Sequence, residues 1–140
     1  MKETFVLDAC ALIAFLDDEE GADKVEDILR KARRNECAIY MNKLNILEIY
    51  YGIFREDSKE KAEKTLSKIL ALPIIVIDRL KDDVFKEAGR LKATYKISLA
   101  DSIVLAEAKI RKASILTTDH HEFDPIDKEE GEEIVFHWIR

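Results

Sequence analysis

Four acidic side chains stand beside or inside apolar segments, where a charge is costly unless it is paired, protonated or bound to a metal. Asp8 follows the β-rich run at residues 4–7, and Asp119 closes a similar run that ends in Thr117 and Thr118. Glu48 and Asp101 each interrupt an apolar helical pattern. Several hard oxygen ligands at one place are what Mg²⁺ or Mn²⁺ requires. We therefore expect a divalent metal site if the fold brings these acids together.

Short β-rich runs alternate with longer helical patterns, which predicts an α/β fold with a mainly parallel sheet of four to five strands. We expect strands at 4–7, 37–41, 74–77, 114–117 and 134–137, the third buried on both faces and the last at the sheet edge. Helices are expected at 9–15 and 21–34 and after Asn42, Ser58, Asp78 and Ser98. The helix after Asn42 has an apolar stripe formed by Leu44, Leu47, Tyr51 and Phe54.

Composition bounds the class of protein. The chain has 140 residues, of which 47% are hydrophobic, which suits one compact domain over residues 1–140. We expect no membrane span and no signal peptide, and two cysteines without a zinc-like spacing indicate reduced thiols in a cytoplasmic protein. The net charge of −6 argues against tight non-specific nucleic-acid binding. It does not exclude a nuclease whose acids are neutralised by a metal.

Each acid also has a structural explanation. Asp8 suits the N-cap of a helix that begins at Ala9, and Asp101 follows Ser98 at capping-box spacing. Asp119 would cap a short turn. Glu48 lies about six residues into its helix, where neither a cap nor the helix dipole stabilises it. A solvated face remains open for Glu48 if the apolar stripe is the only buried one.

Topology links the four acids. In a parallel sheet the carboxyl ends of the strands share one edge, where helices begin. Asp8 and Asp119 follow strands directly, so we expect them to meet there. Converging carboxylates would repel each other, and a divalent cation would remove that penalty. Such an ion lowers the pKa of a bound water and orients it toward a phosphodiester. Thr117 either supplies a hydroxyl to that shell, bonds a carboxylate, or is an ordinary strand residue.

Several segments of the sequence form motifs whose order along the chain is informative. The matching segments are Phe5–Asp8 with Leu12–Leu16, Leu47–Gly52, Ile97–Ala106, and Ile115–Asp119 with Phe123. In these segments the sequence resembles the PIN domain family, and within it the VapC-like toxins of type II toxin–antitoxin pairs. The resemblance implies a three-layer α/β/α sandwich and a Mg²⁺- or Mn²⁺-dependent endoribonuclease.

The resemblance also assigns roles to residues. Asp8, Glu48 and Asp101 would form the acidic triad, Asp119 the fourth acid, and Thr117 a supporting hydroxyl. An RNA substrate, a cognate antitoxin and a homodimer are implied as partners. Cys10 departs from the pattern, because family members often carry Ser or Asn two places after the first Asp.

Other functions remain open on sequence alone. A phosphoaspartyl protein would use Asp8 as its acceptor, although Cys10 stands where a phosphatase of that class usually has a second acid. A non-catalytic interaction module would keep the fold without the chemistry. His120 and His121 suggest a transition-metal site, but no third soft ligand is evident.

Basic and aromatic residues also permit two interpretations. The basic run at residues 30–34 either complements a helix C-terminus or contacts RNA phosphates. Tyr50, Tyr51 and Trp138 either stack on bases or fill the core or an interface.

Overall fold

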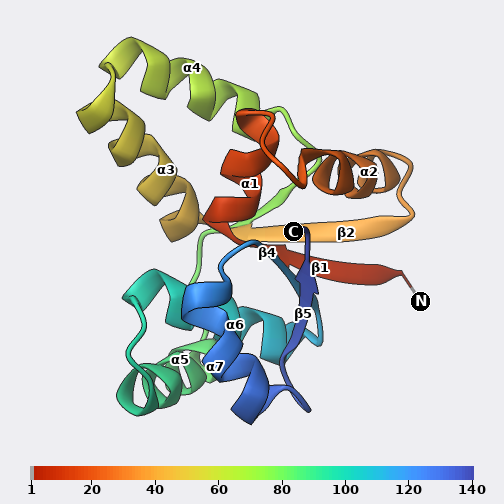
Figure 1. Ribbon diagram of the computed structural model, residues 1–140, viewed down its shortest axis with the longest axis vertical. Coiled ribbons are helices and arrows are strands. Elements are labelled where there is room, and N and C mark those ends of the chain that lie inside the picture. The colour runs from red at the N-terminus through yellow and green to blue at the C-terminus, as the bar shows by residue number, and fades with distance from the viewer. Residues whose placement is uncertain (1) are drawn as a thin grey trace.

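A computed structural model describes residues 2–140 and contains a five-stranded sheet with helices on both faces (Figure 1). The strands are β1 (Glu3–Leu7), β2 (Cys37–Asn42), β3 (Ile75–Ile77), β4 (Ser114–Thr117) and β5 (Val135–Trp138). The helices are α1 (Ala9–Leu16), α2 (Ala22–Arg33), α3 (Lys43–Glu56), α4 (Lys59–Leu70), α5 (Asp82–Thr94), α6 (Leu99–Arg111) and α7 (His120–Glu130). All neighbouring strands are parallel, in the order β3-β2-β1-β4-β5. The α/β prediction is confirmed.

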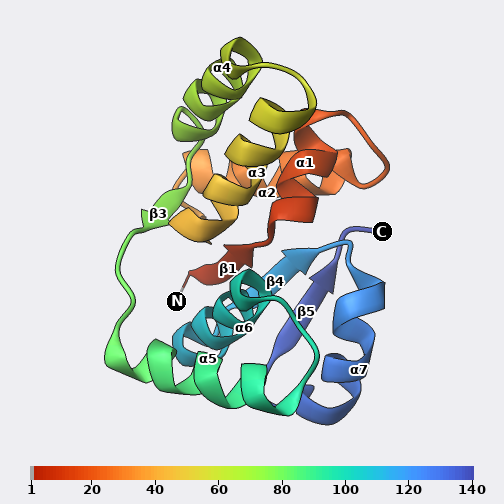
Figure 2. The same ribbon diagram turned by 90° about the vertical axis from the view of Figure 1, so that its left-hand side faces the viewer.

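Residues of β1 alternate between the two faces of the sheet, as strand geometry requires. Phe5 and Leu7 pack into a core with residues of α1, α2, α3 and α4, whereas Val6 packs into a second core with residues of α5, α6 and α7. Figures 1 and 2 show these two groups of helices on opposite sides of the sheet. The expected three layers are therefore present.

The strand order reverses at β1. From β1 the chain first adds β2 and β3 on one side, and it then crosses to add β4 and β5 on the other. The carboxyl ends of β1 and β4 therefore border the switch point, where open α/β sheets leave a crevice for ligands. The backbone N–H of Asp8 donates to the carbonyl oxygen of Leu116 at 3.0 Å, which ties the two strand ends together.

The prediction that the third strand is buried on both faces is wrong. β3 pairs with β2 alone and forms one edge of the sheet, while β5 forms the other edge as expected. Ile75 is consequently 50% exposed. A continuous apolar run does not distinguish an edge strand from a central one, because hydropathy carries no information about strand order.

Two helix boundaries also differ from the predictions. α5 begins at Asp82 after Lys81, so Asp78 does not cap it. The short turn expected at Asp119 is the start of α7, an 11-residue helix whose charged sequence contains Pro125 and hides the helical pattern. Most positions of α7 are polar or charged, so few apolar residues remain to mark a buried face. None of the helices formed by residues 2–140 has the length and apolarity needed to cross a bilayer.

The apolar stripe expected to be buried on α3 is exposed. Leu44, Leu47, Tyr51 and Phe54 lie on the outer side of the helix, whereas its buried positions include Ile46 and Ile49. α3 carries two apolar faces, and the one with Ile46 and Ile49 packs into the core that also contains residues of α1, α2 and α4. Periodicity alone does not select between them.

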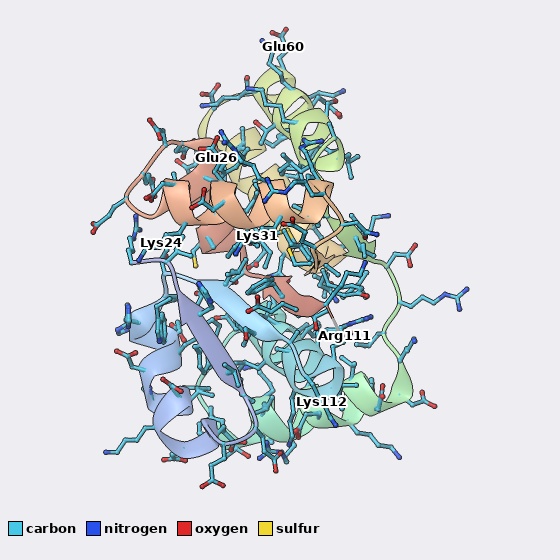
Figure 3. All side chains as sticks on the ribbon, turned by 90° about the vertical axis from the view of Figure 1, so that its right-hand side faces the viewer. Lys24, Glu26, Lys31, Glu60, Arg111 and Lys112 are labelled. Carbon is cyan, nitrogen blue, oxygen red and sulfur yellow. The ribbon has the colours of Figure 1, made fainter. Side chains whose placement is uncertain are left out.

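α6 is buried along most of its length, and one of its buried side chains is charged. Glu107 is buried in the middle of the helix. Arg111, four residues later, donates to it from Nε at 2.7 Å, and the guanidinium also lies 4.2 Å from the centroid of the Tyr40 ring. Figure 3 shows Arg111 and Lys112 at the end of α6 opposite to Asp101.

Gly21 is required by the path of the chain before α2. Its φ is +95°, and a Cβ placed there would lie 2.6 Å from the carbonyl oxygen of Ile139. We expect Gly21→Ala to lower the free energy of unfolding by at least ~1–2 kcal/mol, the cost of left-handed backbone alone. Thermal melting would measure the loss. Gly89→Ala is the control, because Gly89 lies inside α5 with nothing within 4 Å of a new Cβ and should gain about 1 kcal/mol. Equal losses at both positions would contradict the assignment.

Candidate active site

Asp8 is buried at the carboxyl end of β1 and caps α1. Its Oδ1 accepts a hydrogen bond from the backbone N–H of Ala9 at 2.9 Å, the cap expected from the sequence. Its Oδ2 accepts from Cys10 Sγ at 3.0 Å and from Thr117 Oγ1 at 2.9 Å. Burial raises the pKa of Asp8 despite these three hydrogen bonds. The same hydrogen bonds hold the Asp8 carboxylate in one orientation.

Thr117 joins the ends of β1 and β4. Its hydroxyl donates to Asp8 and accepts from the backbone N–H of Asp119 at 3.0 Å. Asp119 in turn caps α7, where its Oδ1 accepts from the backbone N–H of Glu122 at 3.1 Å. Of the roles considered for Thr117, the structure shows the bond to a carboxylate. Both strand-terminal acids thus combine a capping bond with a place at the switch point.

Asp101 enters the site from the first turn of α6. Its backbone N–H donates to Ser98 Oγ at 3.1 Å, which confirms the capping arrangement. The side chain is half-buried. Burial first, and then the charge of Asp8, raises the pKa of Asp101 to about 7, with smaller contributions from Asp119 and Glu48. Asp101 is therefore electrostatically coupled to the three other acids.

Glu48 completes the group from α3. It is half-buried, and its Oε1 accepts from Asn45 Nδ2 at a long 3.5 Å. Burial and then the charge of Asp8 raise the pKa of Glu48, and the Asn45 hydrogen bond opposes that shift. A fully solvated position for Glu48, which the sequence left open, is not found.

One open pocket of about 430 Å³ collects these side chains. Asp8, Glu48, Asp101 and Asp119 all line it. They come from the ends of β1 and β4 and from helices on both faces of the sheet, α3 above and α6 below in Figure 2. The fold therefore brings together the four acids that were singled out in the sequence.

Comparison with known families accounts for this arrangement. A model of the PIN domain matches residues 5–129, a range that includes all four acids. The chain belongs to the PIN domain family. Among curated proteins, none matches this PIN domain in sequence.

Solved structures extend the likeness over nearly the whole chain. The DNA-bound VapBC of Salmonella typhimurium contains a chain with a TM-score of 0.74 at 15% identity, covering 100% of both chains. VapBC2 of Rickettsia felis, bound to a promoter DNA fragment, gives 0.72 at 16% identity over 96% of this chain and 98% of that chain. VapBC-1 of nontypeable Haemophilus influenzae gives 0.72 at 16% identity over 97% and 98%. At such low identity these matches establish a common fold.

The donors in the PIN domain pocket suit a hard divalent cation. Carboxylate oxygens are the ligands of Mg²⁺ and Mn²⁺, and a cation would relieve the repulsion that, after burial, contributes to the raised pKa of Asp101. Within residues 2–140, no three His, Cys, Asp or Glu side chains already form a closed set around a metal position. Mg²⁺ commonly keeps several waters and binds through only one or two carboxylates, so an open pocket fits it.

The structure adds residues to the pocket beyond the four acids, and among them Arg55 was not singled out in the sequence. Tyr51 and Arg55 line the pocket from α3. They follow Glu48 by three and seven residues, and this helical spacing was a signal available in the sequence. Cys10 also lines the pocket, and its Sγ accepts from the backbone N–H of Thr118 at 3.4 Å. Burial and the charge of Asp8 raise the pKa of Cys10 to about 11.

His120 is occupied by other contacts. Its two ring nitrogens hydrogen-bond to Asp124 Oδ1 and to the carbonyl oxygen of Arg140, both at 2.9 Å. Its ring also stacks on Trp138 with centroids 3.8 Å apart. These contacts disfavour the transition-metal interpretation. They also cover one face of Trp138 that a base would need.

The basic run lies on α2, outside the pocket. Arg30 pairs with Glu26 at 2.8 Å and Arg34 with Glu36 at 3.0 Å, all on the surface. Figure 3 shows Glu26 and Lys31 along this helix. The run therefore fits the interpretation as a solvated helix C-terminus better than an RNA contact.

The phosphoaspartyl alternative finds little support. A phosphoaspartyl receiver, the other protein of this kind, usually carries a lysine after a late strand, whereas Thr118 and Asp119 follow β4 and no lysine is found among the described residues that line the pocket. The match to the PIN domain model, which covers Asp8, also points away from a phosphoaspartyl protein.

Proposed function

We propose that this PIN domain is a Mg²⁺- or Mn²⁺-dependent endoribonuclease and the toxin of a toxin–antitoxin pair. The observation that supports the proposal is the convergence of Asp8, Glu48, Asp101 and Asp119 on one pocket at the switch point of the sheet. Helix capping alone does not explain why four acids lie at one place. Their mutual repulsion is destabilising, and a bound cation would remove it.

The four carboxylates would hold the metal, directly or through its bound waters, and the other residues would orient them and the substrate. When bound, the ion supplies a water of lowered pKa and stabilises negative charge on the leaving oxygen. Cys10 and Thr117 fix the Asp8 carboxylate through hydrogen bonds to Oδ2. At the pocket rim, exposed Arg55 would contact an RNA phosphate and Tyr51 would stack on a base.

An antitoxin and a second copy of the chain are the proposed protein partners, in the cytoplasm. VapBC-5 of Mycobacterium tuberculosis, a member of a toxin–antitoxin family, shares the fold with a TM-score of 0.61. For the antitoxin, we propose the groove of about 660 Å³ that apolar Ile13, Leu16 and Ile53 help to line. For the homodimer, the exposed Leu44 and Leu47 offer an apolar surface.

The proposal is tested by incubating the purified protein with a mixture of transfer, ribosomal and messenger RNA. We expect endonucleolytic fragments with millimolar Mn²⁺, none with excess EDTA, and recovery when Mn²⁺ is restored. Thermal melting with and without Mn²⁺ runs alongside. If Mn²⁺ changes neither the melting temperature nor the RNA, the protein is a non-catalytic interaction module with a PIN fold.

A further inference from the structure

Asn45 is a buried amide beside the acidic pocket with an incomplete set of hydrogen bonds. It lies on α3, is 0% exposed, and precedes Glu48 by three residues on the same side of the helix. Its Nδ2 lies 3.5 Å from Glu48 Oε1. Its Oδ1 has no partner, and it is the one such buried side-chain atom found in residues 2–140.

Packing does not explain an amide at this position. The neighbouring buried residues of α3 are apolar, among them Ile46 and Ile49. A buried carbonyl oxygen without a hydrogen bond is destabilising, and a leucine of similar size would avoid that cost. The amide therefore weakens the core, and the one side-chain hydrogen bond found for it in residues 2–140 goes to Glu48.

Glu48 in turn depends on this amide. Asp8 is fixed by hydrogen bonds from Ala9, Cys10 and Thr117, whereas the one side-chain bond found for Glu48 in the described chain comes from Asn45. A glutamate has three rotatable side-chain bonds, so an unanchored carboxylate spends much of its time away from any one ligand position. The 3.5 Å separation is long, and hydrogen bonds of this kind often tighten only when the ligand is bound.

We propose that Asn45 is a positioning residue of the metal centre. Its Nδ2 donates to Glu48 Oε1 and directs that carboxylate into the pocket, and Glu48 Oε2 stays free for a divalent cation. This inference rests on the proposed function, because it assigns Glu48 to the metal. The amide is thus retained at a cost to the stability of the core.

The test compares Mn²⁺ affinity and metal-free melting temperature in the full chain. We expect Asn45→Leu to raise the Mn²⁺ dissociation constant about 10- to 100-fold, the range for losing a hydrogen bond that orients a metal ligand. Its metal-free melting temperature should equal or exceed that of the wild type, because the unpartnered oxygen is gone. Titration calorimetry and thermal melting give the two values.

Ile46→Val is the matched control, since it alters packing at the adjacent buried position and should leave Mn²⁺ affinity unchanged. If Asn45→Leu does not fold, Asn45→Ala removes the same amide and should show the same loss of affinity. Wild-type affinity in either folded Asn45 variant would overturn the inference while leaving the proposed function intact. Absence of Mn²⁺ binding by the wild type would instead remove the proposed function, and the inference with it.

Discussion

Replacing Asp101 with asparagine is expected to raise the stability of the metal-free protein at pH 8 and to weaken its stabilisation by Mn²⁺. Burial and the nearby acids raise the pKa of Asp101 to about 7 in the folded protein, above its ordinary value near 3.8. The folded state thus binds a proton more tightly than the unfolded state does. Stability should therefore fall as the pH rises from about 4 through about 7, and Asp101→Asn should reduce that fall.

The Asp101→Asn variant also tests metal binding and RNA cleavage. At a hundred times its dissociation constant, Mn²⁺ should stabilise the wild type by ~2.7 kcal/mol and Asp101→Asn far less. RNA cleavage should fall by more than about 100-fold, since even residues that only orient a metal ligand are worth 10- to 100-fold. Asp82→Asn is the control, because it changes an exposed acid in the first turn of α5. Full cleavage by Asp101→Asn would remove Asp101 from the site.

Arg111→Ala is expected to cause a large loss of stability without involving the pocket. It would leave Glu107, whose side chain is 2% exposed, without its ion-pair partner, and it would also remove the guanidinium packed on Tyr40. Breaking a buried pair from one side costs roughly 3–5 kcal/mol. For a chain of this size each kcal/mol lowers the melting temperature by about 2–4 °C. Thermal melting should show a drop of about 10 °C.

A surface pair provides the comparison. Arg34 and Glu36 are both exposed and screened by solvent, so Arg34→Ala should lower the melting temperature far less than Arg111→Ala does. If Arg111→Ala loses no more than Arg34→Ala, Glu107 does not depend on Arg111 for its charge compensation.

The convergence of the four acids could be predicted from sequence more accurately than some of the helices and strands that carry them. Asp8 and Asp119 directly follow strands, and a parallel sheet places such residues at one edge. Glu48 stood out because its helix position offers no cap. The side-chain partners were not accessible in the same way, because a bond such as that between Thr117 and Asp8 joins residues 109 positions apart and depends on which strands are neighbours.

The errors in the fold have a common physical origin. β3 is apolar but lies at an edge, and the stripe from Leu44 to Phe54 is apolar but exposed. Hydropathy states which residues favour burial, whereas strand order and helix packing decide which of them are covered. α7 shows the converse, since a helix with many charges is held in place by the few buried residues Phe123 and Ile126.

The capping bonds of Asp8 and Asp119 also determine what a growth assay would report. An alanine at either position would remove a helix cap worth about 1 kcal/mol together with the carboxylate. Losses of 1–2 kcal/mol can change the amount of a protein in a cell several-fold, because quality control removes unfolded molecules. For the proposed toxin, a weaker effect of an alanine variant on growth would then mix lower abundance with lost chemistry. Asparagine caps a helix as well as aspartate does, so Asp119→Asn separates the two. At Asp8 an asparagine can keep the capping oxygen, but its NH2 group cannot accept the hydrogen bonds of Cys10 and Thr117, so Asp8→Asn needs a parallel measurement of stability.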